Sequence, residues 1–319
     1  MFDLVRPDLD LVENEFRRCT VSSLQPVTEV GRYLQGSGGK RLRPALLLLA
    51  AKSCGYEGPA AVRLGAVVEM VHKSTELHDD VLDKAERRCG HSSTHSPWDN
   101  RLSLLAGAWL YNQAFGIAFG ERNFRVLDIL TNVAQIMLEG GVSQHVRLGK
   151  IDVTEDEYLD LAHRNTASLF SACMCLGSVL GGLSVTEEGR LCSYGTNLGL
   201  AFQIVDDLLD FISSEEKPGK PIGRDLLRGK VTLPLIYLLK KCGPEETAKV
   251  ARVLEERAFH SVRFEEILDL VRASGALGAA GKRAGQFAEQ ARRCLEGLPD
   301  SIYRDALRSL PDFIIERQS

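Results

Sequence analysis

The sequence lacks the features that mark several common protein classes. Its 319 residues include 39 Lys and Arg against 43 Asp and Glu, which gives a formal charge of −4. Nucleic-acid binders usually carry a strong basic excess, so this balance argues against nucleic acid as a partner. No apolar run reaches the ~18 residues of a membrane span, and the first residues lack the pattern of a signal peptide. We therefore expect a cytoplasmic protein.

The eight cysteines lack the spacing of a metal site. No CxxC pair occurs, and Cys173 and Cys175 are separated by one residue, which is the wrong spacing for a zinc knuckle. We expect the cysteines to be free thiols that behave as small hydrophobes in a reducing cytoplasm.

Strand-like alternation is nearly absent, and apolar residues instead recur at intervals of three and four along most of the chain. Residues 59–78 show this pattern after a proline suited to a first helical turn, and residues 185–213 continue it. The longest polar, glycine-bearing stretch is 213–230, and no change of composition marks a domain boundary. The sequence predicts an all-α fold with many helices around a common centre, in a single domain over residues 1–319.

Two clusters of aspartates stand out within these helices. They are DDxxD patterns made by Asp79, Asp80 and Asp83, and by Asp206, Asp207 and Asp210. Positions three and four apart share a helix face, so these carboxylates repel one another. A solvated acidic surface would explain one such cluster, but the second lies in an apolar segment, where carboxylates must be paired or bind metal. Carboxylates and substrate phosphates are ligands that suit Mg²⁺, and we expect the clusters to face each other around it.

Basic residues accompany both acidic clusters. The segment GSGGKRLRP places Lys40 and Arg43 at a predicted helix start, where backbone N–H groups favour phosphate. Arg88 follows the first cluster, and Lys220 and Lys230 follow the second. Each could be an ordinary solvated side chain, but together with the aspartates they predict a polyanionic substrate that bridges metal and protein.

Histidines leave a rival hypothesis open. His72 lies two helical turns before Asp79 on a similar face, and is either a ligand-binding or a structural residue. His78 forms an HD dipeptide with Asp79, as in helical phosphohydrolases that bind metal through His and Asp. That class needs further histidines on earlier helices, and none precedes His72 in the sequence.

The motifs GGKRLRP, DDVLD with a following arginine, FQIVDDLLD and GKPIGRDLLRGKVTLP occur in one order along the chain. In this order and spacing the chain resembles the trans-isoprenyl diphosphate synthase (polyprenyl synthetase) family, most clearly over residues 30–240. The resemblance implies an isoprenoid-synthase-type bundle of about ten or more helices around a central cavity. It also implies a prenyltransferase that condenses isopentenyl diphosphate with an allylic diphosphate, uses roughly two or three Mg²⁺ ions and forms a homodimer. Its lipid product would pass to membrane enzymes.

The resemblance assigns roles to individual residues. The metal ligands would be Asp79, Asp80, Asp83, Asp206 and Asp210, with Asp207 supporting the metal shells. The groups that neutralise the leaving diphosphate, where negative charge develops, would be Arg88, Lys220 and Lys230. Isopentenyl diphosphate would be held by Lys40, Arg43 and His72. Thr166 and Gln203 resemble polar residues near the reacting carbons, although each could equally be a satisfied buried polar group.

Two small residues bear on product length. Ser74 and Thr75 lie about one helical turn before the first aspartate, where the growing chain would pass. Short-chain members of the family block this place with aromatic rings. The resemblance therefore implies a product longer than farnesyl, such as a quinone side-chain precursor.

Four positions depart from the family pattern. Cys89 stands where a second arginine usually grips isopentenyl diphosphate, a charge-assisted contact of ~1.5–3 kcal/mol, and Asn165 stands where a lysine usually contacts the allylic diphosphate. Lys73 and Glu76 replace apolar or small residues. Glu76 lies four residues before Asp80 and could add a carboxylate to the metal cluster, but we expect it to pair with Lys73 on an outer surface. Ala108 stands where aspartate is frequent.

These departures leave two alternatives to an active synthase. One is an enzyme like a class I terpene cyclase, which ionises an allylic diphosphate without condensing it; the loss of arginine at position 89 motivates it. The other is a non-catalytic subunit of a heteromeric prenyl synthase, against which the two retained aspartate clusters weigh.

Overall fold

A computed structural model describes residues 2–36, 41–82, 87–88, 91–92, 100–212 and 223–316 of the chain. Regular structure in these ranges is helical apart from one antiparallel pair of two-residue strands, β1 (Arg87–Arg88) and β2 (His91–Ser92). The prediction of an all-α fold is confirmed.

The described helices make up most of the chain. In chain order they are η1 (Phe2–Val5), α1 (Arg6–Cys19), α2 (Gln25–Gly36), α3 (Leu42–Ser53), α4 (Ala60–Leu82), α5 (Asn100–Gly120), α6 (Phe124–Arg147), α7 (Glu155–Ala162), the π-helical turn η2 (His163–Ala167), α8 (Ser168–Leu180), α9 (Val185–Ile212), α10 (Arg224–Leu227), α11 (Leu233–Leu239), α12 (Pro244–Glu256), α13 (Phe264–Ala273), α14 (Ala276–Cys294) and α15 (Ile302–Ile315).

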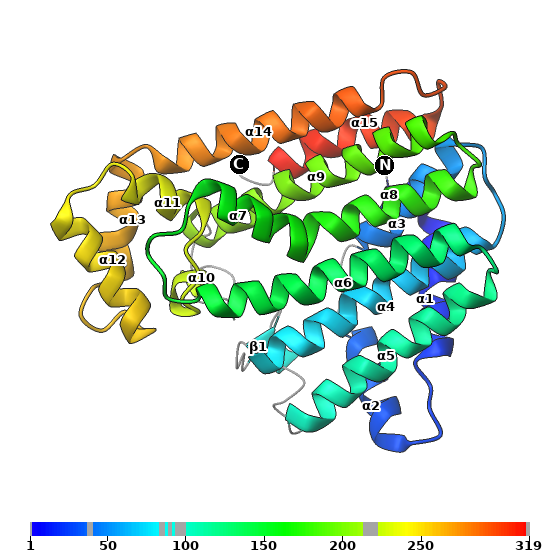
Figure 1. Ribbon diagram of the computed structural model, residues 1–319, viewed down its shortest axis with the longest axis horizontal. Helices are drawn as coiled ribbons and strands as arrows, with labels where there is room; N and C mark the ends of the chain where they lie inside the picture. Colours follow the sequence, from blue (N-terminus) through cyan, green and yellow to red (C-terminus); the bar gives the residue numbers. More distant parts are fainter. Residues whose placement is uncertain are drawn as a thin grey trace.

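The core of the bundle is built on helices that are apolar on all sides. Residues 168–170 and 172–178 of α8 are all buried, and the run Leu46 to Leu49 of α3 has at most 1% of its surface exposed. A helix that is hydrophobic all round must be buried. Accordingly, α3 packs on α8, and α8 and α9 lie between α14 and α15 on one side and α4 and α5 on the other (Figure 1).

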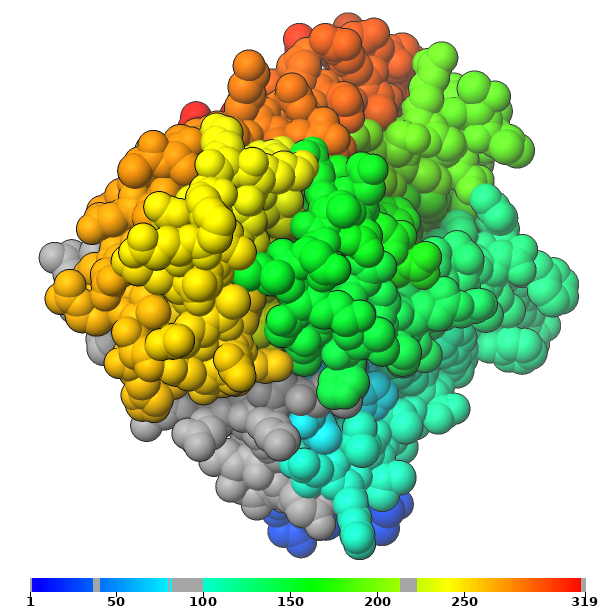
Figure 2. All heavy atoms as spheres, turned by 60° about the vertical axis from the view of Figure 1, so that its left-hand side comes forward, coloured from blue at the N-terminus to red at the C-terminus, as the bar shows by residue number. Residues whose placement is uncertain are grey.

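Both helices that carry aspartate clusters end toward the same part of the molecule. The C-terminal ends of α4 and α9 lie on the side where α10 follows (Figure 1). Figure 2 turns this side forward and shows α11 to α13, in yellow and orange, meeting the green segment of α6 and α7. Beside this contact, the Gly149 N–H after α6 donates at 2.8 Å to the Gly229 carbonyl, which lies between α10 and α11. Elements from distant parts of the sequence therefore close this end of the bundle.

Two glycines allow α9 to approach its neighbours closely. A Cβ atom on Gly195 would lie 2.5 Å from the Phe170 carbonyl oxygen, and one on Gly199 would lie 2.5 Å from the Ala167 Cα. Real Cβ atoms essentially never come this close to other atoms, so only glycine fits at the present separation. Gly199 is one turn before Gln203, which is thereby brought against η2.

Helix α5 is more apolar over its length than expected from the sequence. Among the described residues it is the helix that is long and apolar enough, by length and composition, to cross a membrane, although only 33% of its most apolar window is buried. A core helix can meet the same criteria, and α5 packs along α4 through a row of small side chains that includes Ser103, Ala106 and Gly107. The expectation that no segment reaches this length and composition is wrong for α5.

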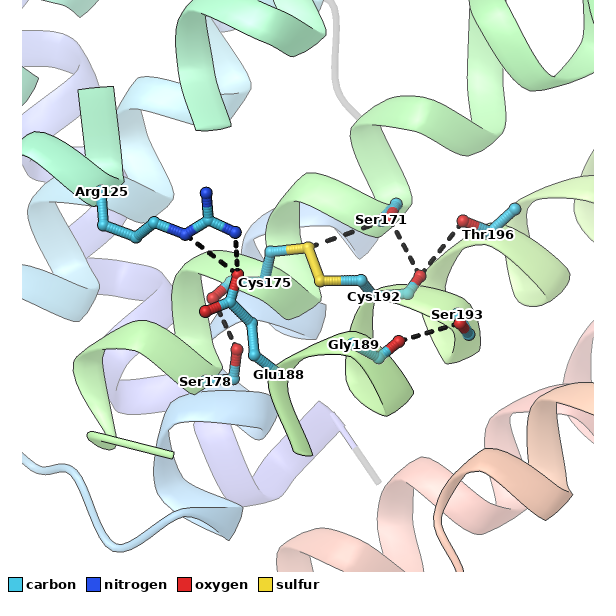
Figure 3. Close-up of a disulfide and its surroundings, with 9 residues drawn as sticks. All are labelled: Arg125, Ser171, Cys175, Ser178, Glu188, Gly189, Cys192, Ser193 and Thr196. Atoms are coloured by element: carbon cyan, nitrogen blue, oxygen red, sulfur yellow. Dashed lines mark hydrogen bonds and ion pairs between the residues drawn. A yellow bond between two sulfur atoms is a disulfide. The ribbon is translucent and has the colours of Figure 1, made fainter. Parts of the chain in front are cut away.

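A disulfide between Cys175 and Cys192 joins α8 to α9 (Figure 3). Its two Cα atoms are 5.0 Å apart, and the Ser171 hydroxyl beside it donates to the Cys192 carbonyl at 2.9 Å. The expectation that all cysteines are free thiols is therefore wrong for this pair. The other described cysteines are free: Cys19, Cys54, Cys173, Cys242 and Cys294.

We predict that Cys175→Ser lowers the free energy of unfolding of the oxidised protein by about 3 kcal/mol, because the bond closes a loop of moderate length in the unfolded chain. Chemical denaturation with and without reductant measures this. Reductant should weaken the wild-type protein and leave Cys175→Ser unchanged, whereas Cys242→Ser should behave as wild type. Equal stability of wild type and Cys175→Ser without reductant would show that the bond does not form.

Candidate functional site

The three aspartates of the second cluster lie in three different environments. Asp206 is exposed, Asp207 is only 4% exposed, and Asp210 is partly buried. All three are on α9, near its C-terminal end. Their side chains therefore have different access to a bound ion.

Asp207 is held by neutral hydrogen-bond donors. The Tyr158 hydroxyl on α7 donates to Oδ2 at 2.6 Å, and the Gln203 amide donates to Oδ1 at 2.7 Å. Burial raises the pKa of the Asp207 carboxyl well above its usual range, and the nearby charge of Asp225 adds to this. Both oxygens of Asp207 thus accept a hydrogen bond from within the protein.

Thr166 and Gln203 hydrogen-bond each other directly. The Thr166 hydroxyl on η2 donates to the Gln203 Oε1 atom at 2.6 Å. Thr166 is buried and Gln203 partly buried. Isolated π-helical turns within α-helices are frequent at functional sites, and this one carries Thr166.

Asp210 caps the short helix α10. Its Oδ1 accepts the backbone N–H of Arg224 at 3.1 Å, and its Oδ2 accepts that of Asp225 at 3.0 Å. Burial and then the charge of Asp225 raise the pKa of Asp210 to about 6, while these two hydrogen bonds oppose the shift. Each oxygen keeps a further lone pair that an ion could use.

The described part of the first cluster lies at the end of α4. Asp79 is partly buried there. The side chain of Asp80 and all of Asp83 lie outside the described residues. Within the described ranges, no three His, Cys, Asp or Glu side chains are close enough to hold a metal ion. The carboxylate oxygens of Asp79, Asp206 and Asp210 are nevertheless the donor type that Mg²⁺ and Ca²⁺ prefer.

Lys73 and Glu76 pair as expected, but not on an outer surface. The Lys73 Nζ is 2.9 Å from the Glu76 Oε2, and Lys73 is only 6% exposed. Glu76 also approaches the His72 Nε2 atom at 3.5 Å. Lys73 is buried and Glu76 partly buried, and the pair adjoins the histidine that is predicted to bind substrate.

Arg43 on α3 is partly buried and is influenced by charges on both acidic helices. Its Nε is buried without a hydrogen-bond partner among the described residues, and its Cζ lies 5.3 Å from the centroid of the Phe170 ring. Burial lowers the pKa of Arg43 below its ordinary value. The negative charges that oppose this come from Glu69 and Glu76 on α4 and from Asp206 on α9. A guanidinium whose Nε–H is buried and unpaired is a fitting place for an anionic ligand.

Several predicted substrate residues cannot be placed. Lys40 and Lys220 lie outside the described residues, as does the side chain of Arg88. Cys89 lies outside them too. Lys230 is partly buried beside α10, where its backbone N–H donates to the Asp225 carbonyl at 2.8 Å.

Asn165 is tied to α6. Its amide donates to the Gln144 Oε1 atom at 2.8 Å. The adjacent Arg164 is engaged elsewhere, in ion pairs of 3.0 Å with Asp160 and with Glu139. The position where lysine is usual therefore carries a neutral amide, and the neighbouring Arg164 directs its charge to Asp160 and Glu139.

The two residues predicted to control product length face different surroundings. Ser74 is fully buried, and its hydroxyl donates to the Gly107 carbonyl of α5 at 2.7 Å. Thr75 is partly buried, and its hydroxyl donates to the Val71 carbonyl of its own helix at 2.8 Å. Ser74 therefore lies in the contact between α4 and α5, and Thr75 is the more accessible of the two.

Tyr158 is a site residue that the sequence did not reveal. It lies in the polar-looking segment EDEYLDLA of α7, and nothing in its spacing relates it to Asp207. The nearest signal is a capping box at the start of α7, in which Thr154 and Glu157 hydrogen-bond each other's backbone N–H. That motif indicates a helix start but not which residue points inward.

Comparisons with known proteins agree with this architecture. A sequence model of the family described as polyprenyl synthetase matches residues 25–271. The chain is 35% identical over 296 residues to octaprenyl diphosphate synthase of Escherichia coli (strain K12), which covers 93% of this chain and 91% of the relative.

Solved structures are similar over almost the whole chain. A decaprenyl diphosphate synthase from Rhodobacter capsulatus superposes with a TM-score of 0.93 at 36% identity, covering 99% of this chain and 98% of that one. A polyprenyl synthase from Caulobacter crescentus CB15, solved with calcium and isoprenyl diphosphate, gives a TM-score of 0.94 at 33% identity and covers 99% and 97% of the two chains.

We predict that Gly199→Ala destabilises the protein by about 1–3 kcal/mol, because the new methyl group must push η2 away from α9. The same shift should break the Thr166–Gln203 contact and reduce turnover. Thermal unfolding and steady-state kinetics measure the two effects. Gly189→Ala on the same helix is the control, since its Cβ would meet nothing within 4 Å. Similar stability and turnover in both variants would contradict the tight packing described above.

Proposed function

Because the chain belongs to the polyprenyl synthetase family, we propose that it condenses isopentenyl diphosphate with an allylic diphosphate to form a trans polyprenyl diphosphate longer than farnesyl. The observation that carries this proposal is the environment of Arg43, whose buried Nε–H has no hydrogen-bond partner among the described residues and whose charge is influenced by carboxylates from both α4 and α9. Such an arrangement suits a diphosphate that is bound by metal ions and by a cation together.

The metal is proposed to be Mg²⁺, with roughly two or three ions in the site. The family uses divalent metal, and the Caulobacter crescentus relative was solved with calcium. Asp79 and Asp206 would hold the ions, with the neighbouring aspartates Asp80, Asp83 and Asp210. Bound metal would supply positive charge to the diphosphate as it leaves.

The side chains of the protein would then perform three tasks. Lys40, Arg43 and His72 would bind isopentenyl diphosphate. Arg88, Lys220 and Lys230 would neutralise the negative charge that grows on the leaving diphosphate. Thr166 and Gln203 would place their dipoles beside the allylic cation, and the released diphosphate would accept the proton lost from the condensation product.

The two alternative functions receive less support. The relatives named above are all described as polyprenyl or longer-chain diphosphate synthases. A terpene-cyclase-like enzyme or a non-catalytic subunit is not favoured by these similarities.

The test of the proposed function is a condensation assay. We expect purified protein with Mg²⁺, radiolabelled isopentenyl diphosphate and farnesyl or geranylgeranyl diphosphate to yield labelled chains longer than the primer, and EDTA to abolish the reaction. Unlabelled hydrocarbon or alcohol from the allylic substrate alone would instead indicate a cyclase-like enzyme. Turnover that appears only after a second protein is added would indicate a subunit.

Product length is proposed to depend on Thr75, since Ser74 is enclosed between α4 and α5. We predict that Thr75→Phe shortens the product by one or more isoprene units, because an aromatic ring would obstruct the path of the growing chain. Reversed-phase separation of the dephosphorylated products measures the length. Thr75→Val, which keeps the side-chain shape, should leave the length unchanged. An active Thr75→Phe enzyme with wild-type products would exclude this position.

A homodimer is proposed from an apolar face on α5 and α6, which pack against each other. Exposed hydrophobic side chains gather on these two helices: Leu104, Leu105, Phe119, Phe124, Leu138, Val142 and Val146. Apolar patches of this kind mark interaction surfaces. A second copy of the chain is the proposed occupant.

We predict that Val142→Glu yields monomers, because a charge would be buried in the contact. Sedimentation velocity measures the change. Val185→Glu is the matched control, since Val185 is 84% exposed but lies at the start of α9, outside this face. A wild-type protein that sediments as a monomer would refute the proposed dimer.

Three further expectations remain proposals. The chain is proposed to form one domain over residues 1–319, to work in the cytoplasm and to pass its lipid product to membrane enzymes. The Cys175–Cys192 bond is the feature that does not fit a reducing compartment. Thiol alkylation of freshly lysed cells would reveal whether the bond exists there.

A further inference from the structure

We infer that Tyr158 is a positioning residue for the reaction: through Asp207 it sets the orientation of the Gln203 amide beside Thr166. The inference rests on the proposed function and adds to it a residue outside the aspartate motifs. Tyr158 does not contact the proposed ligands of the metal directly; it acts through a chain of hydrogen bonds.

The chain of hydrogen bonds links three elements. Tyr158 on α7 donates to Asp207 at 2.6 Å, Gln203 donates to the other oxygen of Asp207 at 2.7 Å, and Thr166 on η2 donates to Gln203 at 2.6 Å. Tyr158 and Thr166 belong to one continuous helical segment, because α7 runs directly into η2. The four side chains therefore tie both ends of this segment to α9.

The direction of each hydrogen bond follows from the chemistry of the groups. The Gln203 Nε2 group donates to the Asp207 Oδ1 atom, as only the NH₂ end of an amide can. The carbonyl oxygen of the amide then faces Thr166, whose hydroxyl must donate to it. Without Asp207 in this position, the amide could rotate and present either end to the site. Asp207 thus determines the direction of the Gln203 dipole.

Tyr158 in turn fixes Asp207. The tyrosine is 7% exposed and the aspartate 4% exposed, so water cannot readily replace the hydroxyl. Loss of that hydroxyl would leave Oδ2 buried without its donor, which is costly. Asp207 would then be held by the Gln203 amide alone. The hydroxyl of Tyr158 keeps Asp207 committed to Gln203.

The test compares two buried tyrosines that each donate one short hydrogen bond. Tyr158→Phe removes the bond to Asp207, and Tyr194→Phe removes a bond of equal length, 2.6 Å, from Tyr194 to the Leu307 carbonyl. Tyr194 is also fully buried, but it lies outside the site. We expect similar losses of thermal stability in both variants. Only Tyr158→Phe should lower kcat, on the order of tenfold, with KM for both substrates unchanged.

A double variant tests whether the loss of the Tyr158 hydroxyl lowers kcat through the hydrogen bonds that lead to Thr166. Tyr158→Phe and Thr166→Val change hydroxyls that do not touch each other, so independent roles would make their effects on kcat multiply. We expect the double variant to lose little more than either single variant. Should Tyr158→Phe fail to fold, Thr166→Val alone must lower kcat without changing KM.

The outcomes distinguish failure of the proposed function from failure of the role inferred for Tyr158. Wild-type protein that does not elongate a primer would overturn the proposed function and this inference with it. An active wild type in which Tyr158→Phe keeps full kcat, or loses no more than Tyr194→Phe, would overturn the inference alone. Multiplying effects in the double variant would do the same.

Discussion

The close packing of α9 against α8 and η2 is the constraint on which the rest of the structure depends. It requires hydrogen in place of a side chain at Gly195 and Gly199, because any Cβ there would overlap the neighbouring backbone. The disulfide between Cys175 and Cys192 crosses the same contact nearer the start of α9 (Figure 3). Further along, this packing holds Gln203 within hydrogen-bond distance of Thr166. The position of the second aspartate cluster follows from the position of α9.

The second cluster avoids the repulsion of its own carboxylates by giving each a different partner. Asp207 turns inward to the neutral donors Tyr158 and Gln203. Asp210 accepts two backbone N–H groups at the start of α10, a position favourable for an anion. Asp206 stays exposed, which leaves it the most accessible of the three to a metal ion. One motif thus contains a positioning group, a helix cap and a candidate ligand.

Much of this fold could be read from the sequence because helical periodicity and capping are local properties. The resemblance to the family placed Thr166 and Gln203 only as polar residues of one site, and the structure shows their contact. The burial of individual side chains was not predictable, because a helical pattern shows on which face of the helix a residue lies but not what packs against that face. Lys73 was expected at an outer surface and is buried beside Glu76.

Contacts between distant segments were equally hidden from the sequence. The disulfide joins cysteines on two helices whose separation follows no known motif. Tyr158 and Asp207 meet only because α7 and α9 pack together, and no spacing in the chain announces that contact. The parts of the site that depend on tertiary packing therefore required the structure.

The most direct measurement of the central claim is the location of metal ions by anomalous scattering, in crystals soaked with Mn²⁺ and an unreactive thio analogue of an allylic diphosphate. The account predicts manganese between the ends of α4 and α9, bound by Asp79 and Asp206 and by the diphosphate of the analogue, with Asp207 still turned toward Tyr158. Manganese coordinated by Asp207, or a diphosphate bound with no metal between the two helices, would contradict it.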